Sequence, residues 1–179
     1  MHELLAEGGY PALTMDAVAA RAGVGKAAIY RRHASKAEMV FAVTVHGLEL
    51  QAPPDTGALR TDLEAALADI HTRLDAPAIM RDAPLFIAEL GANPELSQRF
   101  RDTLMAAELA CVVEILGRAA ARGELRERPD PAQVHSLMLG AVFAWRFMLR
   151  RDPTPALVPD LADLITRGLA AEPRSSDVP

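Results

Sequence analysis

Residues 14–36 read TMDAVAARAGVGKAAIYRRHASK, and this stretch decides the fold. It holds both lysines of the chain and three arginines against a single acid, Asp16, so its net charge is +4. The whole chain carries −5, which leaves −9 on everything outside this stretch. The pattern of helix-forming and turn residues within this segment explains why positive charge is concentrated there.

A short helix, a glycine and a second short helix account for the spacing. Thr14 can cap the first helix with its hydroxyl. Gly23 stands where a helix ends in the left-handed conformation that glycine adopts cheaply, and the second helix is expected over about 25–33. The apolar residues expected on the inner faces are Val18, Ala19, Ala22 and Ile29. This pattern predicts a helix-turn-helix, whose second helix enters the major groove of DNA.

The order and spacing of these residues resemble the N-terminal domain of the TetR family of bacterial transcriptional regulators. The match covers 23 positions without a gap, and the matching residues are Thr14-Met15-Asp16-Ala17-Val18-Ala19, Ala22-Gly23-Val24-Gly25-Lys26, Ile29-Tyr30 and Ser35-Lys36. The resemblance implies that Tyr30 and Lys36 contact DNA phosphates. The positions that it implies for base contacts are Gly25, Lys26, Ala27 and Arg31. Thr14 and Arg32 are two further candidates for DNA contact.

This chain departs from the family pattern at three places. Ala28 stands where threonine is common, so one phosphate hydrogen bond is expected to be missing. His33 stands where an aromatic or other apolar residue is usual, which alters the packing expected there. Residues 1–7 supply only about two turns of the family's first helix. A truncated first helix predicts a weaker N-terminal core and weaker DNA binding.

The composition favours an all-α fold. The helical pattern along the chain predicts about nine helices, and the resemblance implies that the first of them is truncated. Half of the residues are hydrophobic but only 4% are aromatic, so alanine and leucine dominate, and both are strong helix formers. No sustained alternation of β-branched residues predicts a strand. Cys111 is the single cysteine, which excludes an internal disulfide and fits a reducing cytosol. With no visible signal peptide and no apolar run of membrane length, we expect a cytoplasmic protein without a membrane partner.

The clearest break in the chain is the proline-rich linker at 51–57. It predicts a helix-turn-helix domain at 1–50, whose last helix begins at a capping box at Ser35. The resemblance implies that this helix links the two domains. A helical regulatory and dimerisation domain is expected at 58–171. Residues 172–179 have no apolar content to anchor them and predict a disordered tail.

Helical periodicity and capping residues divide the second domain. The expected helices are 58–75, 78–91 (bent or split by Pro84), a long helix from Pro94 with Asn93 as its cap, 131–150 with Asp130 as its cap, and 156–169. The helix after Asp130 is apolar nearly all round beyond Leu137, so it must be covered on more than one side. TetR-like proteins dimerise through their last two long helices, which implies a homodimer through 130–150 and 155–169. Two copies would then read the two halves of a palindromic double-stranded operator.

The family also implies a small-molecule inducer bound inside the second domain. Methionine and aromatic side chains suit an adaptable apolar cavity, and a few polar groups could orient a ligand. The candidates for lining it are His71, Met80, Phe86, Glu89, Met105, Met138 and Trp145. His135, Phe143 and Met148 share these properties. The alternative for each residue is plain core or dimer interface.

The sequence offers no pattern for catalysis. The histidines have no metal-ligand spacing, and no nucleophile triad, phosphate-cradling glycine loop or carboxylate pair stands out, so we expect no enzyme, no metal and no cofactor. Cys111 is either a buried, inert thiol or a redox sensor. The resemblance therefore predicts a ligand-released repressor, with an activator or a ligand-independent DNA-binding protein of the same fold as the alternative. A second alternative is an interaction or enzymatic module that uses the helix-turn-helix only for packing.

Overall fold

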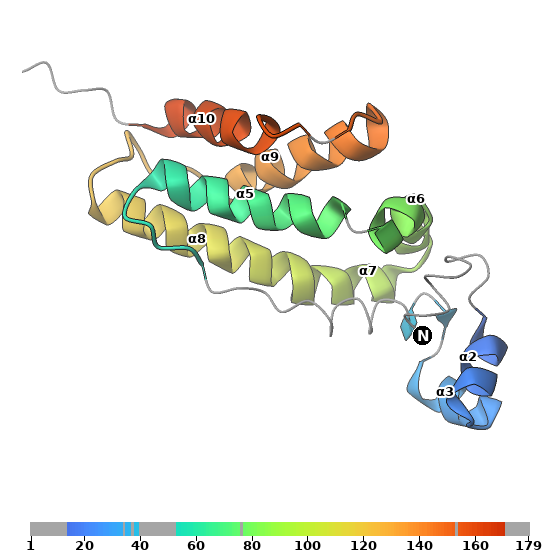
Figure 1. Cartoon of the computed structure of the whole chain (residues 1–179). Helices are drawn as coiled ribbons and strands as arrows, with labels where there is room; N and C mark the ends of the chain where they lie inside the picture. Colours follow the sequence, from blue (N-terminus) through green and yellow to red (C-terminus); the bar gives the residue numbers. More distant parts are fainter. Residues whose placement is uncertain are drawn as a thin grey trace, which may run out of the picture. The chain divides into compact units, whose positions relative to one another are not determined.

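The computed structural model describes residues 14–33, 35–36, 38–39, 53–75, 77–152 and 154–170, with the backbone alone at 77–82. Its helices are α2 (Met15–Ala22), α3 (Lys26–Arg32), α5 (Leu59–Asp75), α6 (Pro77–Ala92), α7 (Pro94–Phe100), η1 (Arg101–Met105), α8 (Ala106–Ala121), α9 (Pro131–Phe143), η2 (Ala144–Met148) and α10 (Leu157–Leu169). Figure 1 shows these elements in sequence order by colour. No strand occurs within these ranges, where Leu125 and Ala170 form an isolated bridge. The expected all-α fold is confirmed.

The structure describes fewer helices than the nine expected. Segments α7, η1 and α8 follow one another without a break, as do α9 and η2, so the described residues form seven continuous helices. The other two of the nine expected helices are those at 1–7 and at about 35–50. The first lies outside the described residues, and of the second only Ser35, Lys36, Glu38 and Met39 are described.

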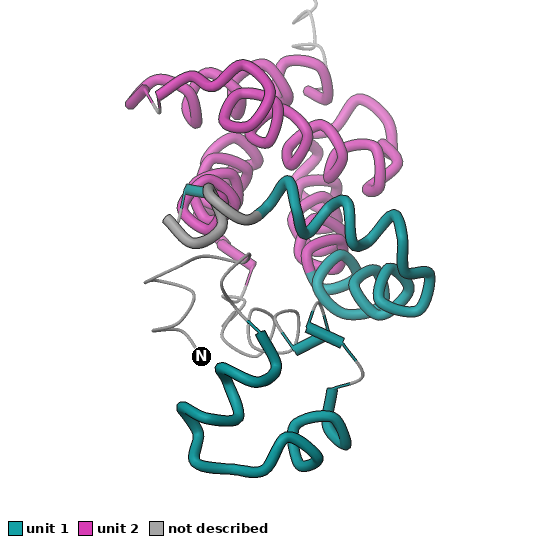
Figure 2. Tube along the Cα trace, turned by 90° about the vertical axis from the view of Figure 1, so that its right-hand side faces the viewer, with its two compact units in different colours: residues 1–50, 75–107 teal, residues 51–74, 108–179 magenta. Residues whose placement is uncertain are grey.

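The chain forms two compact units, each built from two separate segments. One comprises 1–50 and 75–107, and the other comprises 51–74 and 108–179 (Figure 2). The second unit begins at the proline-rich break. The domain boundaries expected from the sequence stay predictions, and the expected disordered tail lies outside the described residues.

The second unit is a helical bundle around an apolar core. Helices α5, α8, α9 and α10 lie side by side, with α5 beside both α8 and α9 (Figure 1). The core residues are Leu59, Leu63, Ala66, Leu67, Ile70, Val112, Ile115, Leu116, Ala119, Val134, Met138, Val142 and Ala162. On α5 they recur three or four positions apart, which places them on one helical face. Burial of that face against the other three helices is what stabilises α5 as a helix.

Polar caps fix the beginnings of two long helices where the sequence placed them. The Asn93 side chain accepts a hydrogen bond from the Leu96 N–H at 3.0 Å, ahead of α7. The Asp130 carboxylate accepts one from the Ala132 N–H at 2.9 Å, ahead of α9. Each cap is followed by a proline, whose missing N–H costs nothing in the first turn of a helix. Both capping predictions are confirmed.

Two features of the helices differ from expectation. Helix α6 continues through Pro84, so the split that we considered there is wrong. The ring has no N–H to donate, but the neighbouring turns keep the helix continuous. The two π-helical segments, η1 and η2, were not expected at all. A π-helical segment has one more residue per turn than the α-helix around it. Its position depends on packing, and no sequence pattern predicts it.

The first unit has a smaller apolar cluster of its own. Leu96 on α7 is buried against Phe86, Leu90 and Phe100. The rings of Phe86 and Phe100 meet edge to face, with their centroids 5.6 Å apart. The expected capping box is present in half, because the Ser35 hydroxyl accepts from the Glu38 N–H at 3.1 Å. The Glu38 carboxylate instead pairs with Arg99.

Candidate nucleic-acid interface

Helix α2 is short and its ends are defined by two local devices. The Thr14 hydroxyl accepts a hydrogen bond from the Ala17 N–H at 3.0 Å, which confirms Thr14 as the cap. At the other end Gly23 has φ 67° and ψ 26°, the left-handed conformation, and its N–H bonds back to α2 carbonyls. The buried residues of α2 are Met15, Val18 and Ala19. Ala22, which we expected on this inner face, is exposed because it lies at the turn itself.

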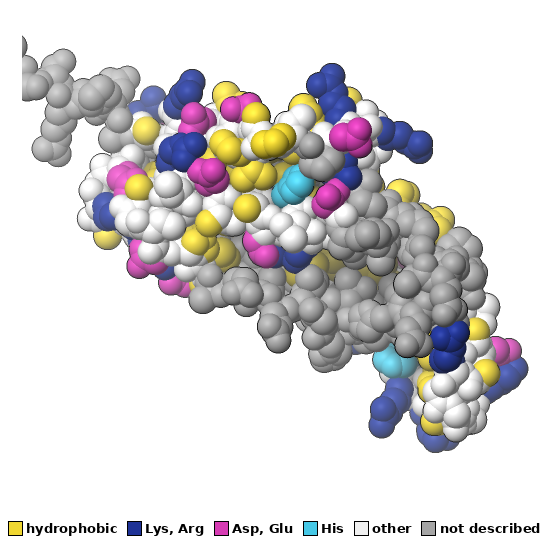
Figure 3. Space-filling model, in the orientation of Figure 1, with side chains coloured by type: hydrophobic (Ala, Val, Ile, Leu, Met, Phe, Trp, Pro, Cys, Tyr) yellow, Lys and Arg dark blue, Asp and Glu magenta, His cyan; other side chains and the backbone are white. Residues whose placement is uncertain are grey.

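Helix α3 follows after Val24 and Gly25, and no residue of it is buried. It runs over Lys26–Arg32, with Gly25 and His33 as its caps, close to the expected 25–33. Ile29, which we expected to face inward, is half-buried, as is Ala28. The exposed candidates for DNA contact are Thr14, Gly25, Lys26, Ala27, Tyr30, Arg31 and Arg32, and Figure 3 shows Lys and Arg side chains gathered over α2 and α3. Lys36 is half-buried.

One cation of α3 is already paired within the motif. The Lys26 ammonium lies 2.5 Å from the carboxylate of Asp16 in the first turn of α2, and both side chains are more than half exposed. The hydrogen bond that Lys26 donates to Asp16, together with the negative charge of Asp16, raises the pKa of Lys26 above its ordinary value. The sequence analysis singled out Asp16 only as the one acid among the cations of residues 14–36. The pairing was missed because it spans ten positions and a turn.

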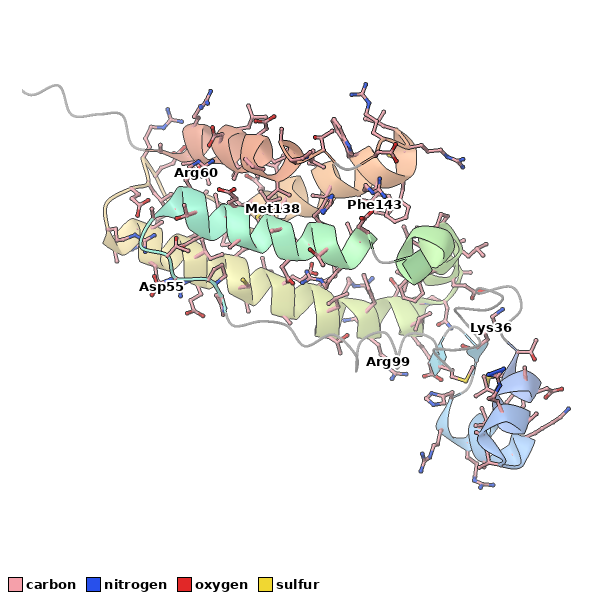
Figure 4. The ribbon with its side chains drawn as sticks, in the orientation of Figure 1. Lys36, Asp55, Arg60, Arg99, Met138 and Phe143 are labelled. Carbon is pink, nitrogen blue, oxygen red and sulfur yellow. The ribbon has the colours of Figure 1, made fainter. Side chains whose placement is uncertain are left out.

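The ligand candidates of the second unit lie in different surroundings. Met138 is fully buried in the apolar core, and Figure 4 labels it on α9 behind α5. Trp145 is half-buried in η2, where its Nε1–H donates to the Asp152 carbonyl at 3.2 Å. The Arg151 guanidinium stands 5.0 Å from the centre of the Trp145 ring. His71 is half-buried, and its Nε2 has no hydrogen-bond partner among the described residues.

The remaining ligand candidates belong to the first unit. Phe86 packs in the small cluster around Leu96. Glu89 on α6 and Met105 in η1 are half-buried. The side chain of Met80 lies outside the described residues. That these seven residues line one ligand cavity therefore stays a prediction. An open hollow of about 520 Å³ lies on α9, between Asp130 and Leu137, and none of the seven lines it.

A buried ionic cluster inside the second unit escaped the sequence analysis. The Glu108 carboxylate on α8 is only 7% exposed and lies 2.6 Å from the guanidinium of Arg73 on α5. Its second oxygen lies 2.8 Å from Nε2 of His135 on α9. Arg73 also pairs with Asp69. These residues are 27 or more positions from Glu108, so no local spacing could reveal the cluster, and His135 is occupied by it.

Several other features bear on what the site can do. Within the described ranges, no group of three or more His, Cys, Asp or Glu side chains could hold a metal ion. None of the described helices combines the length and apolar character needed to cross a membrane. Cys111 is half-buried, and burial raises the pKa of its thiol, which disfavours the reactive thiolate. This observation favours the inert alternative over the redox sensor.

Comparison with known proteins decides the family. Residues 2–43 match the family described as bacterial regulatory proteins, tetR family, and residues 53–165 match the tetracyclin repressor-like C-terminal domain. The chain belongs to the TetR family. TetR-family regulators contain a DNA-binding helix-turn-helix of the kind that α2 and α3 form, so this protein is a DNA-binding transcriptional regulator.

Relatives of this TetR-family chain are themselves regulators. An uncharacterized helix-turn-helix transcriptional regulator of Mycobacterium tuberculosis is 34% identical over 161 residues, covering 89% of this chain and 79% of the relative. The DNA-binding transcriptional repressor TetR of Mycobacteroides abscessus is 32% identical over 139 residues, covering 75% of this chain and 72% of that protein. Both comparisons reach well beyond the helix-turn-helix.

The TetR fold itself is shared with solved structures. The transcriptional regulator FadR of Bacillus subtilis, solved in complex with stearoyl-CoA, aligns with a TM-score of 0.68 at 19% identity. The alignment covers 93% of this chain and 94% of FadR. At this identity the likeness shows the fold alone. Family, fold and the class of DNA-binding regulator are thus confirmed, and the individual contact residues stay predictions.

Proposed function

We propose that this TetR-family regulator is a cytoplasmic, ligand-released repressor that binds a palindromic DNA operator as a homodimer. The observation that carries the proposal is the exposure of α3, a seven-residue helix without one buried residue. A helix that contributes so little to its own unit is available to a partner. The family places such a helix in the major groove, and a relative named as a repressor supports the direction of regulation.

The side chains of α3 divide by the chemistry they can offer DNA. Tyr30 is 55% exposed, and its hydroxyl can donate to a phosphate, as can the Lys36 ammonium. Gly25 and Ala27 have no side-chain donors and allow only close approach. Sequence readout through hydrogen bonds therefore rests on Lys26 and Arg31, the two side chains that can donate to guanine. Contacts of Thr14 and Arg32 with DNA phosphates would add affinity but would not distinguish one DNA sequence from another.

Exposed apolar residues on the last two long helices support the homodimer. Leu137 on α9 is 61% exposed and Leu164 on α10 is 64% exposed. Leu137 lies within 130–150 and Leu164 lies within 155–169, the two segments where we expect the interface. Large aliphatic side chains that gather on adjacent helices mark protein contact surfaces more often than isolated ones do. A self-complementary interface would cover them in two copies at once.

A small-molecule inducer would act through its preference between two dimer shapes. The FadR structure holds stearoyl-CoA, which supports a ligand for a chain of the same fold. We propose that an inducer contacts some of His71, Met80, Phe86, Glu89, Met105, Met138 and Trp145. Suppose that the inducer binds more tightly to a dimer shape whose two α3 helices are not spaced to match the operator. It then lowers the affinity for the operator by the ratio of its own affinities for the two shapes.

Duplex affinity measured against salt tests the DNA contact. A duplex selected from random sequence by the wild-type protein serves as the operator, and fluorescence anisotropy reports binding from about 50 to 300 mM salt. We expect affinity to fall steeply, with a slope of about −0.9 per phosphate contact on logarithmic axes. Replacing Lys36 with glutamine should reduce the slope by about 0.9 per protomer, and sedimentation should show two copies per duplex. A flat salt response would reject DNA binding through phosphates.

A reporter gene placed behind the selected duplex separates the repressor from its alternatives. A repressor lowers expression, whereas an activator raises it. Because Trp145 is the only tryptophan, its fluorescence reports ligands that bind near η2. A compound that changes this fluorescence and also restores expression would support release by a ligand. A ligand-independent binder would show neither response to any compound screened.

A further inference from the structure

We infer that Asp16 raises sequence discrimination by holding the Lys26 ammonium in place of a DNA phosphate. This inference rests on the proposed contact between α3 and DNA. Asp16 lies in the first turn of α2, and Lys26 is the first residue of α3, so the pair bridges the two helices of the motif. The Nζ to Oδ2 distance is 2.5 Å, which is a hydrogen-bonded ion pair.

The other cations of α3 provide a contrast. Within the described part of the chain, Arg31 and Arg32 have no acidic partner, whereas Lys26 has Asp16. Arg31 and Arg32 can therefore meet any phosphate without giving up an existing ion pair. Lys26 can meet one only by leaving the Asp16 carboxylate. A carboxylate and a phosphate offer the ammonium the same kind of anionic oxygen, so the exchange yields little net free energy.

The exposure of the pair makes this exchange possible. The Lys26 side chain is 65% exposed and that of Asp16 is 54% exposed, so neither is locked by burial. Exposed ion pairs of this kind are weak and open readily. On DNA of arbitrary sequence the pair should stay closed, because a phosphate replaces Asp16 with no advantage. At a matching site, the neutral guanine edge can accept from the two ammonium N–H groups that Asp16 does not use, so Lys26 binds there while the pair stays closed.

The consequence is that Asp16 lowers the affinity for DNA of arbitrary sequence more than the affinity for a matching site. With Asp16 present, Lys26 adds little to binding through phosphates. Without Asp16, Lys26 becomes one more cation for any duplex. Asp16 is thus a residue that determines specificity although it donates nothing to DNA itself.

The test compares wild type with Asp16→Asn on two duplexes, one of mixed sequence and one selected by the wild-type protein. We expect the affinity of Asp16→Asn for the mixed duplex to rise about three- to tenfold, and that for the selected duplex by less than about twofold. The salt slope on the mixed duplex should steepen by about 0.9 per protomer. Circular dichroism of each variant checks that helicity is retained.

Two controls separate this effect from a simple change of net charge. Glu127→Gln removes the same charge from an exposed loop residue of the second unit, and it should leave both affinities within about twofold. In a Lys26→Gln background, Asp16→Asn should have no effect, because no ammonium is left to release. A persistent effect in that background would mean that Asp16 merely repels DNA, and would overturn the inference.

The remaining outcomes distinguish the inference from the function beneath it. Equal gains on both duplexes, with salt-dependent binding intact, would overturn the role of Asp16 alone. A wild-type affinity that does not respond to salt would overturn the proposed DNA contact, and the role of Asp16 with it.

Discussion

The helix-turn-helix and the helical bundle of the second unit use their residues in opposite ways. In α2 and α3 the buried residues are few and small or flexible, and α3 has none. In the bundle, the fully buried side chains are large aliphatic ones such as Leu63, Leu67 and Met138. The bundle is stabilised by its core, whereas the motif is held by a cap, a glycine turn and three buried residues of α2.

The two regions also differ in how their positively charged side chains are paired. In the bundle, Arg73 pairs with Glu108 and Arg122 pairs with Asp62, so these two partly buried cations are satisfied internally. Among the residues that the structure describes, Arg31 and Arg32 of α3 have no acidic partner. This difference supports the proposed DNA contacts of Arg31 and Arg32, since a charged group that the fold does not use is available to a partner.

The largest expected effect comes from truncating the bundle core. Leu67→Ala should lower the free energy of unfolding of the bundle by about 3 kcal/mol, because it removes a fully buried side chain and leaves a cavity among α5, α8 and α9. Chemical denaturation followed by helical circular dichroism measures the loss. Val113→Ala is the matched control on an exposed position of α8, and it should cost less than about 0.5 kcal/mol. Similar losses for both variants would contradict the division drawn between core and surface.

The sequence predicted those parts of the fold that depend on local chemistry. Thr14, Asn93 and Asp130 cap helices as expected, because a cap is decided within three residues. These local predictions needed no knowledge of the tertiary fold.

What the sequence could not predict depends on contacts between distant residues. The Glu108 cluster joins three helices, and the Asp16–Lys26 pair forms across a turn whose geometry periodicity does not specify. The π segments depend on packing along a whole helix. The proposed ligand cavity is harder still to predict, since a cavity depends on space left between side chains, and no residue pattern encodes that space.

A smaller effect is expected from Asp62, a fully buried carboxylate near the start of α5. Burial alone would raise its pKa, but hydrogen bonds from the Thr56 N–H at 2.6 Å, the Thr56 hydroxyl at 2.7 Å and the Arg122 guanidinium outweigh burial and lower it. Asp62→Asn should cost about 2 kcal/mol at neutral pH, since it weakens hydrogen bonds made to a charge.

The pH dependence of this effect has a definite sign. Because the pKa of Asp62 is lower in the folded chain, the folded state binds fewer protons, and the carboxylate stabilises it fully above the ordinary pKa of about 3.9. That stabilisation is lost as the pH falls through the lower, folded pKa. Denaturation at a series of pH values should therefore show wild type and Asp62→Asn converging in acid. A constant difference between them down to pH 2 would contradict the assignment.

The smallest effects have opposite signs in the two regions. Gly23 has φ 67°, and an added Cβ would meet no atom within 4 Å, so Gly23→Ala costs only backbone strain, about 1 kcal/mol. Gly117 lies inside α8 without a positive φ and with the same open space, so Gly117→Ala should stabilise the bundle by about 0.5–1 kcal/mol. Amide exchange of α2 and α3 reads the first change, and bundle denaturation reads the second. Because both substitutions add the same methyl group, a shared sign would mean that contacts, and not backbone conformation, set the stability of the turn between α2 and α3.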